Sequence, residues 1–499
     1  MTMVDRRRAE PPLVLTIDVG TSSVRVMLFD ALGRPVDGVG AREAYTIYAD
    51  ASGAAEDDPD EALARVGRCL DEALAQAGPL AAQIGAVAVD TLVSNLLGLD
   101  DGGRPLTPLI TYADTRNDAD AVALRRELDE AAVHDRTGCL LRTSYWPARL
   151  AWLRRSQPEL FRRAARWVTI GEYLELHLFG RCRVSTSAAS WSGLLDRRRL
   201  VWDMPLLEHL GVPQERLSPL ADASEPLRGL LPEPAARWPA LRDVPWFPAL
   251  GDGAAANLGS GCVSPGRVAL TVGTTGALRV VLPEVPRVPD GLWCYRVDAR
   301  RALLGGATSE GGNVYAWMRG ALRIDGPEEV ERALAAMEPD SHGLTVLPFF
   351  AGERSPGWAG DARATVSGVT LGTTPLELVR AGLEAVAYRF ALIYEGLVAD
   401  AQAAPPQIVA SGGALLSSPA WMQIIADVLG RPVVASAETE ATSRGIALLA
   451  LESLGALGAL EDAPAATGET YAPDGGRHAV YCAAVERQRR LYDRVIDQT

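Results

Sequence analysis

A glycine-threonine turn between two apolar runs occurs twice in this chain, and this repeat constrains the fold more than any other feature. Gly20 and Gly273, which begin the two turns, are 253 positions apart in a chain of 499 residues. An arginine follows each turn, Arg25 in the first copy and Arg279 in the second. The spacing predicts two related domains that face one another. A chance match between two common strand-turn-strand patterns is the alternative. The two copies comprise Leu13–Ile17, Gly20–Ser23 and Val24–Phe29, then Val268–Val272, Gly273–Gly276 and Leu278–Leu282.

Helical and extended patterns alternate between and after the two hairpins, which predicts an α/β fold. A stretch rich in proline and aromatic residues, Trp238–Ala249, separates the halves. We therefore expect an N-terminal domain of residues 1–250 and a C-terminal domain of residues 251–499. The patterns predict helices over 59–77, 119–132, 149–155, 158–165, 375–397, 419–429 and 443–454, and strands over 84–89, 344–349 and 407–411.

Composition narrows the class of partner. The formal charge is −14, so neither nonspecific nucleic-acid binding nor an anionic membrane surface is indicated. The six cysteines form no CxxC pair and no cluster with the five histidines, which argues against a disulfide framework or a zinc site. No uninterrupted apolar run is long enough to span a membrane. These observations predict a cytoplasmic protein with no nucleic-acid or membrane partner.

One aspartate, Asp252, stands in a stretch of glycine, alanine and a single asparagine, Ala249–Gly261. A carboxylate where a glycine-rich turn enters a small-residue helix can reach into a cleft, as a general base must. The alternative is that Asp252 only caps the helix that follows it.

Four glycine-rich turns offer unencumbered backbone N–H groups next to strands or helix starts. Such groups bind phosphates in proteins without strong positive charge. Two hairpins from opposite domains would hold a triphosphate from both sides. The four turns are Asp18–Ser23, Gly251–Gly261, Gly273–Gly276 and Ser411–Ala414.

Six segments in this order resemble the FGGY carbohydrate kinases over nearly the whole chain. The resemblance implies two ribonuclease-H-like domains of the actin and hexokinase type with a cleft between them, and transfer of phosphate from ATP to a sugar hydroxyl. The segments are Ile17–Asp30, Gly251–Gly261, Thr271–Gly276, Gly305–Trp317, Leu347–Trp358 and Ser411–Val433.

Within that family the sugar-side segments are most similar to gluconokinases and next to xylulokinases. One departure stands out, because the chain has Val93-Ser94-Asn95 where those enzymes usually have Met-His-Ser or Met-His-Gly. Because the sugar-side segments are most similar to gluconokinases, the resemblance implies gluconate as the acceptor, with xylulose or another ketose or polyol as the alternative. A non-kinase actin-like ATPase or a sugar sensor is the competing class.

The resemblance also assigns roles to individual residues. Asp252 would be the catalytic base, and Asp18 would hold Mg²⁺, although a turn-forming aspartate is the alternative. Partners would be ATP and a small sugar or sugar acid, and relatives suggest a homodimer. The expected nucleotide residues are Gly20, Thr21, Ser22, Arg25, Gly273, Thr274, Thr275, Gly412, Gly413, Ala414 and Ser418; the expected sugar residues are Ser94, Asn95, Asp114, Arg116 and Asp252.

Overall fold

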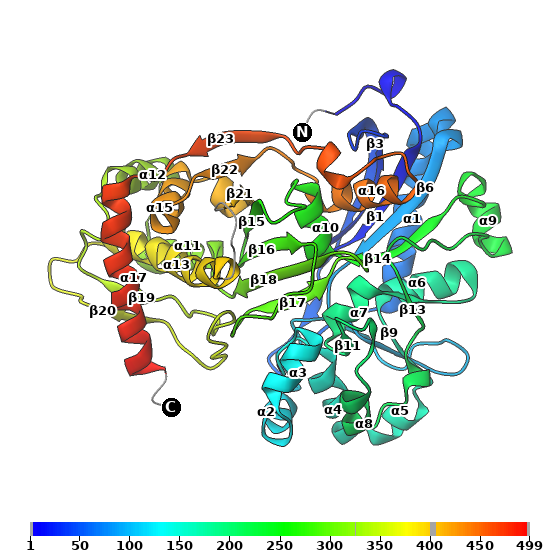
Figure 1. Ribbon diagram of the computed structural model, residues 1–499, viewed down its shortest axis with the longest axis horizontal. Helices are drawn as coiled ribbons and strands as arrows, with labels where there is room; N and C mark the ends of the chain where they lie inside the picture. The colour runs from blue at the N-terminus through cyan, green and yellow to red at the C-terminus, as the bar shows by residue number, and fades with distance from the viewer. Residues whose placement is uncertain (1–2, 325, 400–405, 497–499) are drawn as a thin grey trace.

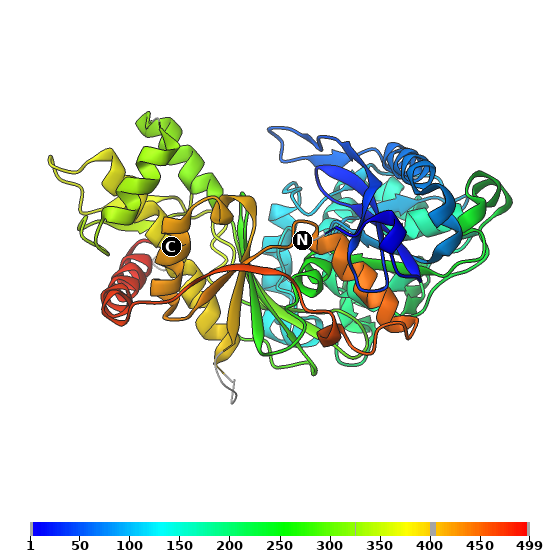
Figure 2. The same cartoon turned by 90° about the horizontal axis from the view of Figure 1, so that it is seen from above.

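The computed structural model describes residues 3–324, 326–399 and 406–496. The chain forms two lobes side by side, each built around its own β-sheet (Figures 1 and 2). The last long helix, α17 (Gly475–Val495), lies on the outer side of the second lobe (Figure 1). This two-domain α/β architecture is the one that the sequence predicts.

The first sheet has five strands in the order β14-β6-β1-β2-β3. β1 and β2 form the first predicted hairpin, and β1 pairs in parallel with β6 on its other side. β14 in turn pairs in parallel with β6, so the carboxyl ends of β1, β6 and β14 meet at one edge. The strand bounds are β1 Leu13–Val19, β2 Ser23–Phe29, β3 Pro35–Ala44, β6 Ile84–Thr91 and β14 Trp246–Gly251.

The second sheet has seven strands in the order β17-β18-β16-β15-β21-β22-β23. Its β15 and β16 form the second predicted hairpin, and β15 pairs in parallel with β21. Each hairpin therefore continues into a parallel strand on the side of its first strand, so the two lobes share this arrangement as well as the turn. The bounds are β15 Arg267–Val272, β16 Gly276–Leu282, β17 Trp293–Arg296, β18 Ala302–Thr308, β21 Gln407–Ser411, β22 Val433–Ser436 and β23 Thr467–Tyr471.

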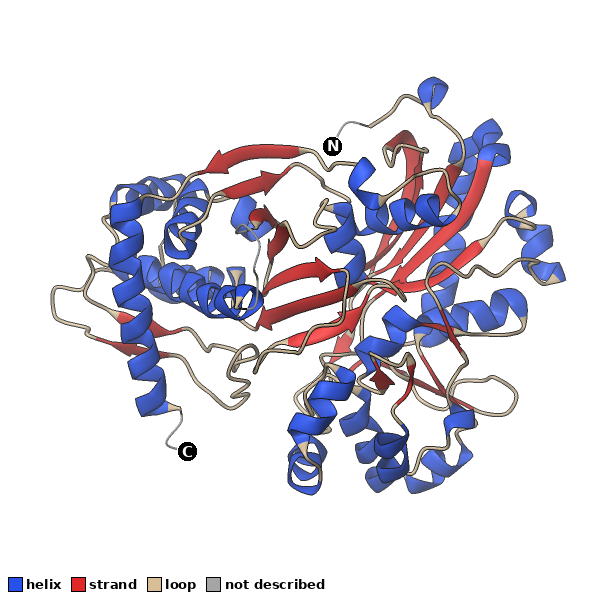
Figure 3. Ribbon diagram, in the orientation of Figure 1, coloured by secondary structure: helices blue, strands red, loops and turns tan. Residues whose placement is uncertain are grey.

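Helices cover both faces of each sheet (Figure 3). One face of the first sheet packs on helices of its own half, α1 (Pro59–Ala77) and α6 (Ile170–Phe179). The other face packs on α10 (Asp252–Gly259) and on α16 (Ala441–Ser453), which comes from near the end of the chain. The second sheet packs on α11 Gly312–Leu322, α12 Pro327–Ala336, α13 Pro375–Val398, α15 Pro419–Leu429 and α17 Gly475–Val495.

α10 and α16 cross with their backbones almost in contact. A Cβ atom added at Gly259 would lie 1.7 Å from the carbonyl oxygen of Ala441, and one added at Gly445 would lie 1.9 Å from that of Ala255. No side chain fits at these two positions, so the crossing depends on glycine in both helices.

The smaller elements complete the two lobes. The helix predicted over 119–132 is two helices, because Asp129 accepts a hydrogen bond from the Ala132 N–H and so caps a new helix. Among the described residues no helix is long and apolar enough to cross a membrane. The remaining helices are α2 Asp118–Glu127, α3 Glu130–Thr137, α4 Trp146–Ser156, α5 Pro158–Arg163, α7 Thr186–Ser192, α8 Met204–Leu210, α9 Pro232–Arg237 and α14 Gly413–Leu416; the remaining strands are β4 Tyr48–Ala49, β5 Ala55–Asp57, β7 Leu97–Leu99, β8 Leu109–Ile110, β9 Arg166–Val168, β10 Val184–Ser185, β11 Leu195–Asp196, β12 Val201–Trp202, β13 Leu220–Ala221, β19 Thr345–Leu347 and β20 Thr365–Ser367.

Candidate active site

Asp252 is the first residue of α10, directly after β14 ends. Gly251 occupies the N-cap position and makes no side-chain cap, while the Asp252 carboxylate accepts a hydrogen bond of 2.7 Å from the N–H of the adjacent Gly253. Burial and the neighbouring Asp18 carboxylate raise the pKa of Asp252 to about 6, against the opposing effects of the Gly253 N–H and Arg279. A carboxylate with a pKa near neutrality is suited to accept a proton from an alcohol.

Two further aspartates lie at the same edge of the first sheet. Asp18 on β1 is in register with Asp90 on β6, and Leu250, two residues before Asp252, pairs with Asp90. Because residues in register on parallel strands point to one face, the three carboxylates gather on the face that α10 and α16 cover. Burial, followed by the charges of Asp18 and Asp252, raises the pKa of Asp90 well above its ordinary value.

Asp90 is a residue of this site that was not predicted from the sequence. Its side chain is fully buried, and its two carboxylate oxygens accept no hydrogen bond from the described residues. An aspartate inside an apolar strand pattern was the available signal. Buried unpartnered carboxylates are costly, which makes Asp90 a candidate functional group.

An all-oxygen donor set fits a hard cation such as Mg²⁺. Asp18 has 5% of its surface exposed, lies beside Asp90, and is 3.7 Å from the Arg25 guanidinium. The carboxylates of Asp18 and Asp90 lie next to each other in register and would suit such an ion. The expectation that Asp18 holds the ion stays a prediction.

The two predicted phosphate turns are held by the chain around them. In the first, the Gly20 carbonyl accepts a hydrogen bond from the Tyr45 hydroxyl, and the Ser22 carbonyl accepts one of 3.0 Å from the Tyr45 N–H. In the second, the carbonyls of Gly273 and Thr274 accept hydrogen bonds from the first residues of α11. Thr21, Ser22, Thr274 and Thr275 thus sit on fixed turns, and their phosphate contacts stay predictions.

Arg25 is already engaged. Its guanidinium lies 3.3 Å from Glu440 and 3.7 Å from Asp18. A phosphate contact by Arg25 would therefore compete with these two carboxylates.

The predicted adenosine loop follows β21. Gly412 has a φ of +94°, and a Cβ atom there would lie 2.3 Å from the carbonyl oxygen of Val272, so only glycine fits. Gly413 faces open space, as a ligand-facing backbone requires. Ser418 caps α15, and its hydroxyl donates to Glu331 over 2.7 Å. Roles for Gly412, Gly413, Ala414 and Ser418 in nucleotide binding stay predictions.

The predicted sugar residues are largely bonded to the protein itself. Ser94 has a φ of +55°, and its hydroxyl donates to the Trp191 carbonyl over 2.6 Å. The Asn95 amide donates to the Leu92 carbonyl over 2.6 Å and accepts from the Ile170 N–H over 2.7 Å. The strained backbone of Ser94 is of the kind that clusters at functional sites.

Asp114 and Arg116 form one ion pair of 2.6 Å, and Arg116 also pairs with Glu56. The Arg116 guanidinium lies 4.6 Å from the ring centre of Trp152. Ser94, Asn95, Asp114 and Arg116 therefore have protein partners, and their contact with a sugar stays a prediction.

An aromatic stack joins the two lobes beside Asp252. Trp191 on α7 stacks on Tyr295 of β17 with ring centres 3.6 Å apart, and the hydroxyls of Tyr145 and Tyr295 are 2.5 Å apart. A Cβ atom added at Gly253 would lie 3.2 Å from the Trp191 ring. Trp191 therefore lies next to the start of α10, and both it and Trp146 are buried members of hydrophobic clusters.

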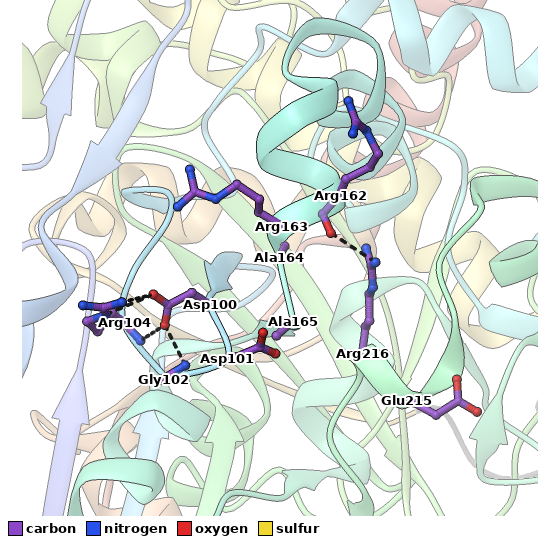
Figure 4. Close-up of a pocket in the computed structure, with 10 residues that line it drawn as sticks. All are labelled: Asp100, Asp101, Gly102, Arg104, Arg162, Arg163, Ala164, Ala165, Glu215 and Arg216. Carbon is purple, nitrogen blue, oxygen red and sulfur yellow. Dashed lines mark hydrogen bonds and ion pairs between the residues drawn. The ribbon is translucent and has the colours of Figure 1, made fainter.

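A charged cavity and a cluster of possible metal ligands lie elsewhere among the described residues, and neither contains a residue that was predicted for the site. A cavity of about 570 Å³ between the loop at Asp100 and α5 is lined by charges of both signs, several of them paired (Figure 4). Asp340, His342 and Glu384 have the ligand types and spacing for a metal ion. Asp340 and Glu384 already pair with arginines, so a structural network accounts for this cluster.

Comparison with known proteins is consistent over the whole chain. The model for the FGGY family of carbohydrate kinases, N-terminal domain, matches residues 13–259, and that for the C-terminal domain matches residues 268–454. A gluconokinase of Bacillus subtilis (strain 168) is 27% identical over 472 residues, which cover 92% of this chain and 91% of that protein.

A glycerol kinase of Trichlorobacter lovleyi is 32% identical over 454 residues, covering 89% of this chain and 90% of the relative. Among solved structures, a ligand-bound xylulose kinase from Lactobacillus acidophilus superimposes with a TM-score of 0.89 at 25% identity, covering 96% of this chain and 98% of that one.

Proposed function

Because this chain belongs to the FGGY family of carbohydrate kinases, and is therefore a phosphotransferase with an alcohol group as acceptor, we propose that it transfers the γ-phosphate of ATP to a hydroxyl of gluconate. The observation that carries the proposal is the position of Asp252 at the head of α10, where both Asp18 of the first lobe and Arg279 of the second act on its charge. The substrate rests on similarity to gluconokinases.

The reaction needs an in-line hydroxyl and a group that takes its proton. Asp252 accepts the proton of the hydroxyl, whose oxygen forms a bond to the γ-phosphorus as the bond to the β–γ bridging oxygen breaks and ADP leaves. The turns with Thr21, Ser22, Thr274 and Thr275 offer N–H and hydroxyl donors to the β- and γ-phosphates.

Asp18, with Asp90 beside it, would hold Mg²⁺, which when bound neutralises phosphate oxygens. Arg25 would change partners from Glu440 to a phosphate. Gly412, Gly413 and Ala414 would let the backbone approach adenosine, with Ser418 at the end of that loop.

The test is ADP release in a coupled assay across gluconate, xylulose, ribulose, glycerol and erythritol, since the relatives include kinases named for glycerol and xylulose. We expect turnover with gluconate, and a loss of 10²- to 10⁴-fold, roughly, in Asp252→Asn. The exposed Asp243→Asn is the matched control. ATP turnover indifferent to every sugar would instead favour an actin-like ATPase or a sensor, and full activity in Asp252→Asn would contradict the role of this carboxylate.

The same preparation can address two further expectations. Closure of the lobes over ATP and sugar predicts a smaller radius of gyration in small-angle scattering with an ATP analogue and gluconate. A homodimer predicts twice the chain mass of 53.1 kDa in light scattering.

A further inference from the structure

Two arginines of the second lobe, Arg279 and Arg354, have no ion-pair partner among the described residues. No hydrogen bond or ion pair from the described residues engages the guanidinium of Arg279 or of Arg354, and Arg279 Nη1 and Arg354 Nε are both buried. Other arginines are paired, as Arg389 is with Glu353 and Arg25 with Glu440. Both arginines are half-buried, and the Arg354 guanidinium lies 5.9 Å from the ring centre of Trp358. Guanidinium nitrogens that are buried without a hydrogen-bond partner are costly, so a ligand group would be a natural partner for this pair.

The two charges act on each other. Arg354 is among the groups that lower the pKa of Arg279, although burial is the main cause. Two like charges close together attract an anion more strongly than either one alone. The pair therefore favours a negatively charged group between the two guanidiniums.

In the part of the chain that the structure describes, none of the acidic groups nearby forms an ion pair with Arg279 or Arg354. Asp252 attracts Arg279 and is the proposed base. Burial raises the pKa of Glu310, near Arg354, to about 8, so Glu310 is mostly uncharged at neutral pH. Glu353 accepts hydrogen bonds from Arg389 and from the Tyr492 hydroxyl. Other ionisable neighbours of the pair include Tyr112, Tyr145, Tyr295 and Cys262.

Arg279 lies away from the second phosphate turn and close to the start of α10. Arg279 is three residues beyond Gly276 on β16, which places it about 10 Å along the strand from that turn. A Cβ atom added at Gly253 would lie 3.7 Å from Arg279 Nε and 3.2 Å from the Trp191 ring. Arg279 and Trp191 therefore border the same space next to Asp252.

We propose that Arg279 and Arg354 together bind the carboxylate of a sugar-acid substrate, a deepening that rests on the proposed kinase function. A planar carboxylate accepts paired charge-assisted hydrogen bonds from guanidinium groups. The acid end of an extended aldonate lies between the two arginines while its far hydroxyl lies at Asp252. A neutral sugar leaves both guanidiniums without an anion, so the site selects for the acid.

The test compares gluconate with D-glucitol, which has the same carbon skeleton and a CH₂OH group in place of the carboxylate. We expect the wild type to favour gluconate in kcat/KM by at least about 100-fold. Arg279→Gln and Arg354→Gln should each lower kcat/KM for gluconate about 100-fold and for glucitol less than threefold, with KM for ATP unchanged. Lysine at either position keeps the positive charge but lacks the paired N–H donors of a guanidinium group, so it should restore part of the kcat/KM for gluconate that glutamine loses.

Controls separate the outcomes. The exposed Arg363→Gln lies in the same loop as Arg354 and should retain wild-type selectivity. If circular dichroism shows that a glutamine variant does not fold, the preference of the wild type for gluconate over glucitol tests the carboxylate assignment by itself. Equal kcat/KM of the wild type for gluconate and glucitol would overturn the carboxylate assignment. Equal losses of kcat/KM for both substrates in the variants would also overturn it, and would indicate a contact with the transferred phosphate instead.

Adding galactonate distinguishes this inference from the choice of gluconate. Turnover of galactonate without gluconate would refute gluconate and support the arginine pair. Turnover of gluconate with unchanged selectivity in both glutamine variants would support the kinase proposal and refute the pair. Calorimetric titration of gluconate without ATP gives an independent readout, in which each glutamine variant should weaken binding at least tenfold.

Discussion

Replacing Asp252 with asparagine should stabilise the folded protein while it strongly lowers activity. The folded state holds the Asp252 proton more tightly than the unfolded state, because burial and Asp18 raise its pKa from 3.8 to about 6. Each tenfold change in proton affinity corresponds to about 1.4 kcal/mol, so ionised Asp252 costs roughly 3 kcal/mol of unfolding free energy above pH 6. Asparagine carries no charge and can still accept the Gly253 N–H hydrogen bond.

The sign of the pH dependence follows from the raised pKa. As pH increases from 3.8 through about 6, the unfolded state loses its proton first, so the wild type loses stability across this window. The variant lacks this loss. Its advantage over the wild type should therefore grow by roughly 1.5 kcal/mol between pH 5 and pH 8.

The measurement is urea unfolding of both proteins at pH 5 and pH 8, followed by circular dichroism without nucleotide or sugar. Asp243→Asn, at an exposed position, is the control that removes one charge outside the cleft. An advantage of Asp252→Asn that is the same at both pH values, or a variant less stable than the wild type at pH 8, would refute the argument from burial.

Three other outcomes test the site and the fold. The kcat/KM of the wild type for gluconate should fall about tenfold per pH unit below pH 6, since Asp252 must be ionised, and a profile that stays flat to pH 5 would count against it. Asp18→Asn should raise the Mg²⁺ concentration for half-maximal activity at least about tenfold and weaken Mn²⁺ binding seen by electron paramagnetic resonance, and unchanged binding of the ion would exclude the role of Asp18. Gly445→Ala should destabilise the protein by about 1–3 kcal/mol, because its Cβ would lie 1.9 Å from the carbonyl oxygen of Ala255, whereas Gly320→Ala on α11 meets nothing within 4 Å; equal urea midpoints for the two variants would contradict this.

Local patterns in the sequence predict much of this fold. The hairpins, α1 and α13 follow from apolar periodicity that a single segment carries, and Asp252 follows from its small neighbours. The predicted helix over 119–132 is wrong in one respect, because Leu128 ends one helix and the Asp129 cap starts another. A cap is a single side-chain contact, and periodicity does not detect it.

The convergence of distant residues is not readable from a single sequence. Asp90 comes next to Asp18 only through strand register, and the charge of Arg354 acts on Arg279 from a loop 75 positions away. Each of these residues alone looks like an ordinary strand or loop residue. Burial and missing partners, which single them out, are properties of the folded chain.

The origin of α16 has a consequence for how this protein is made. Val14, Ala86 and Ala88 of the first sheet are buried together with Ile446, Ala447 and Leu448 of α16. During synthesis, residue 441 follows residue 251 by 190 positions, which takes about 10 to 40 s at roughly 5–20 residues per second. For that interval the ribosome carries a nearly complete first lobe with part of one sheet face still uncovered, so this lobe finishes folding only after most of its partner has been translated.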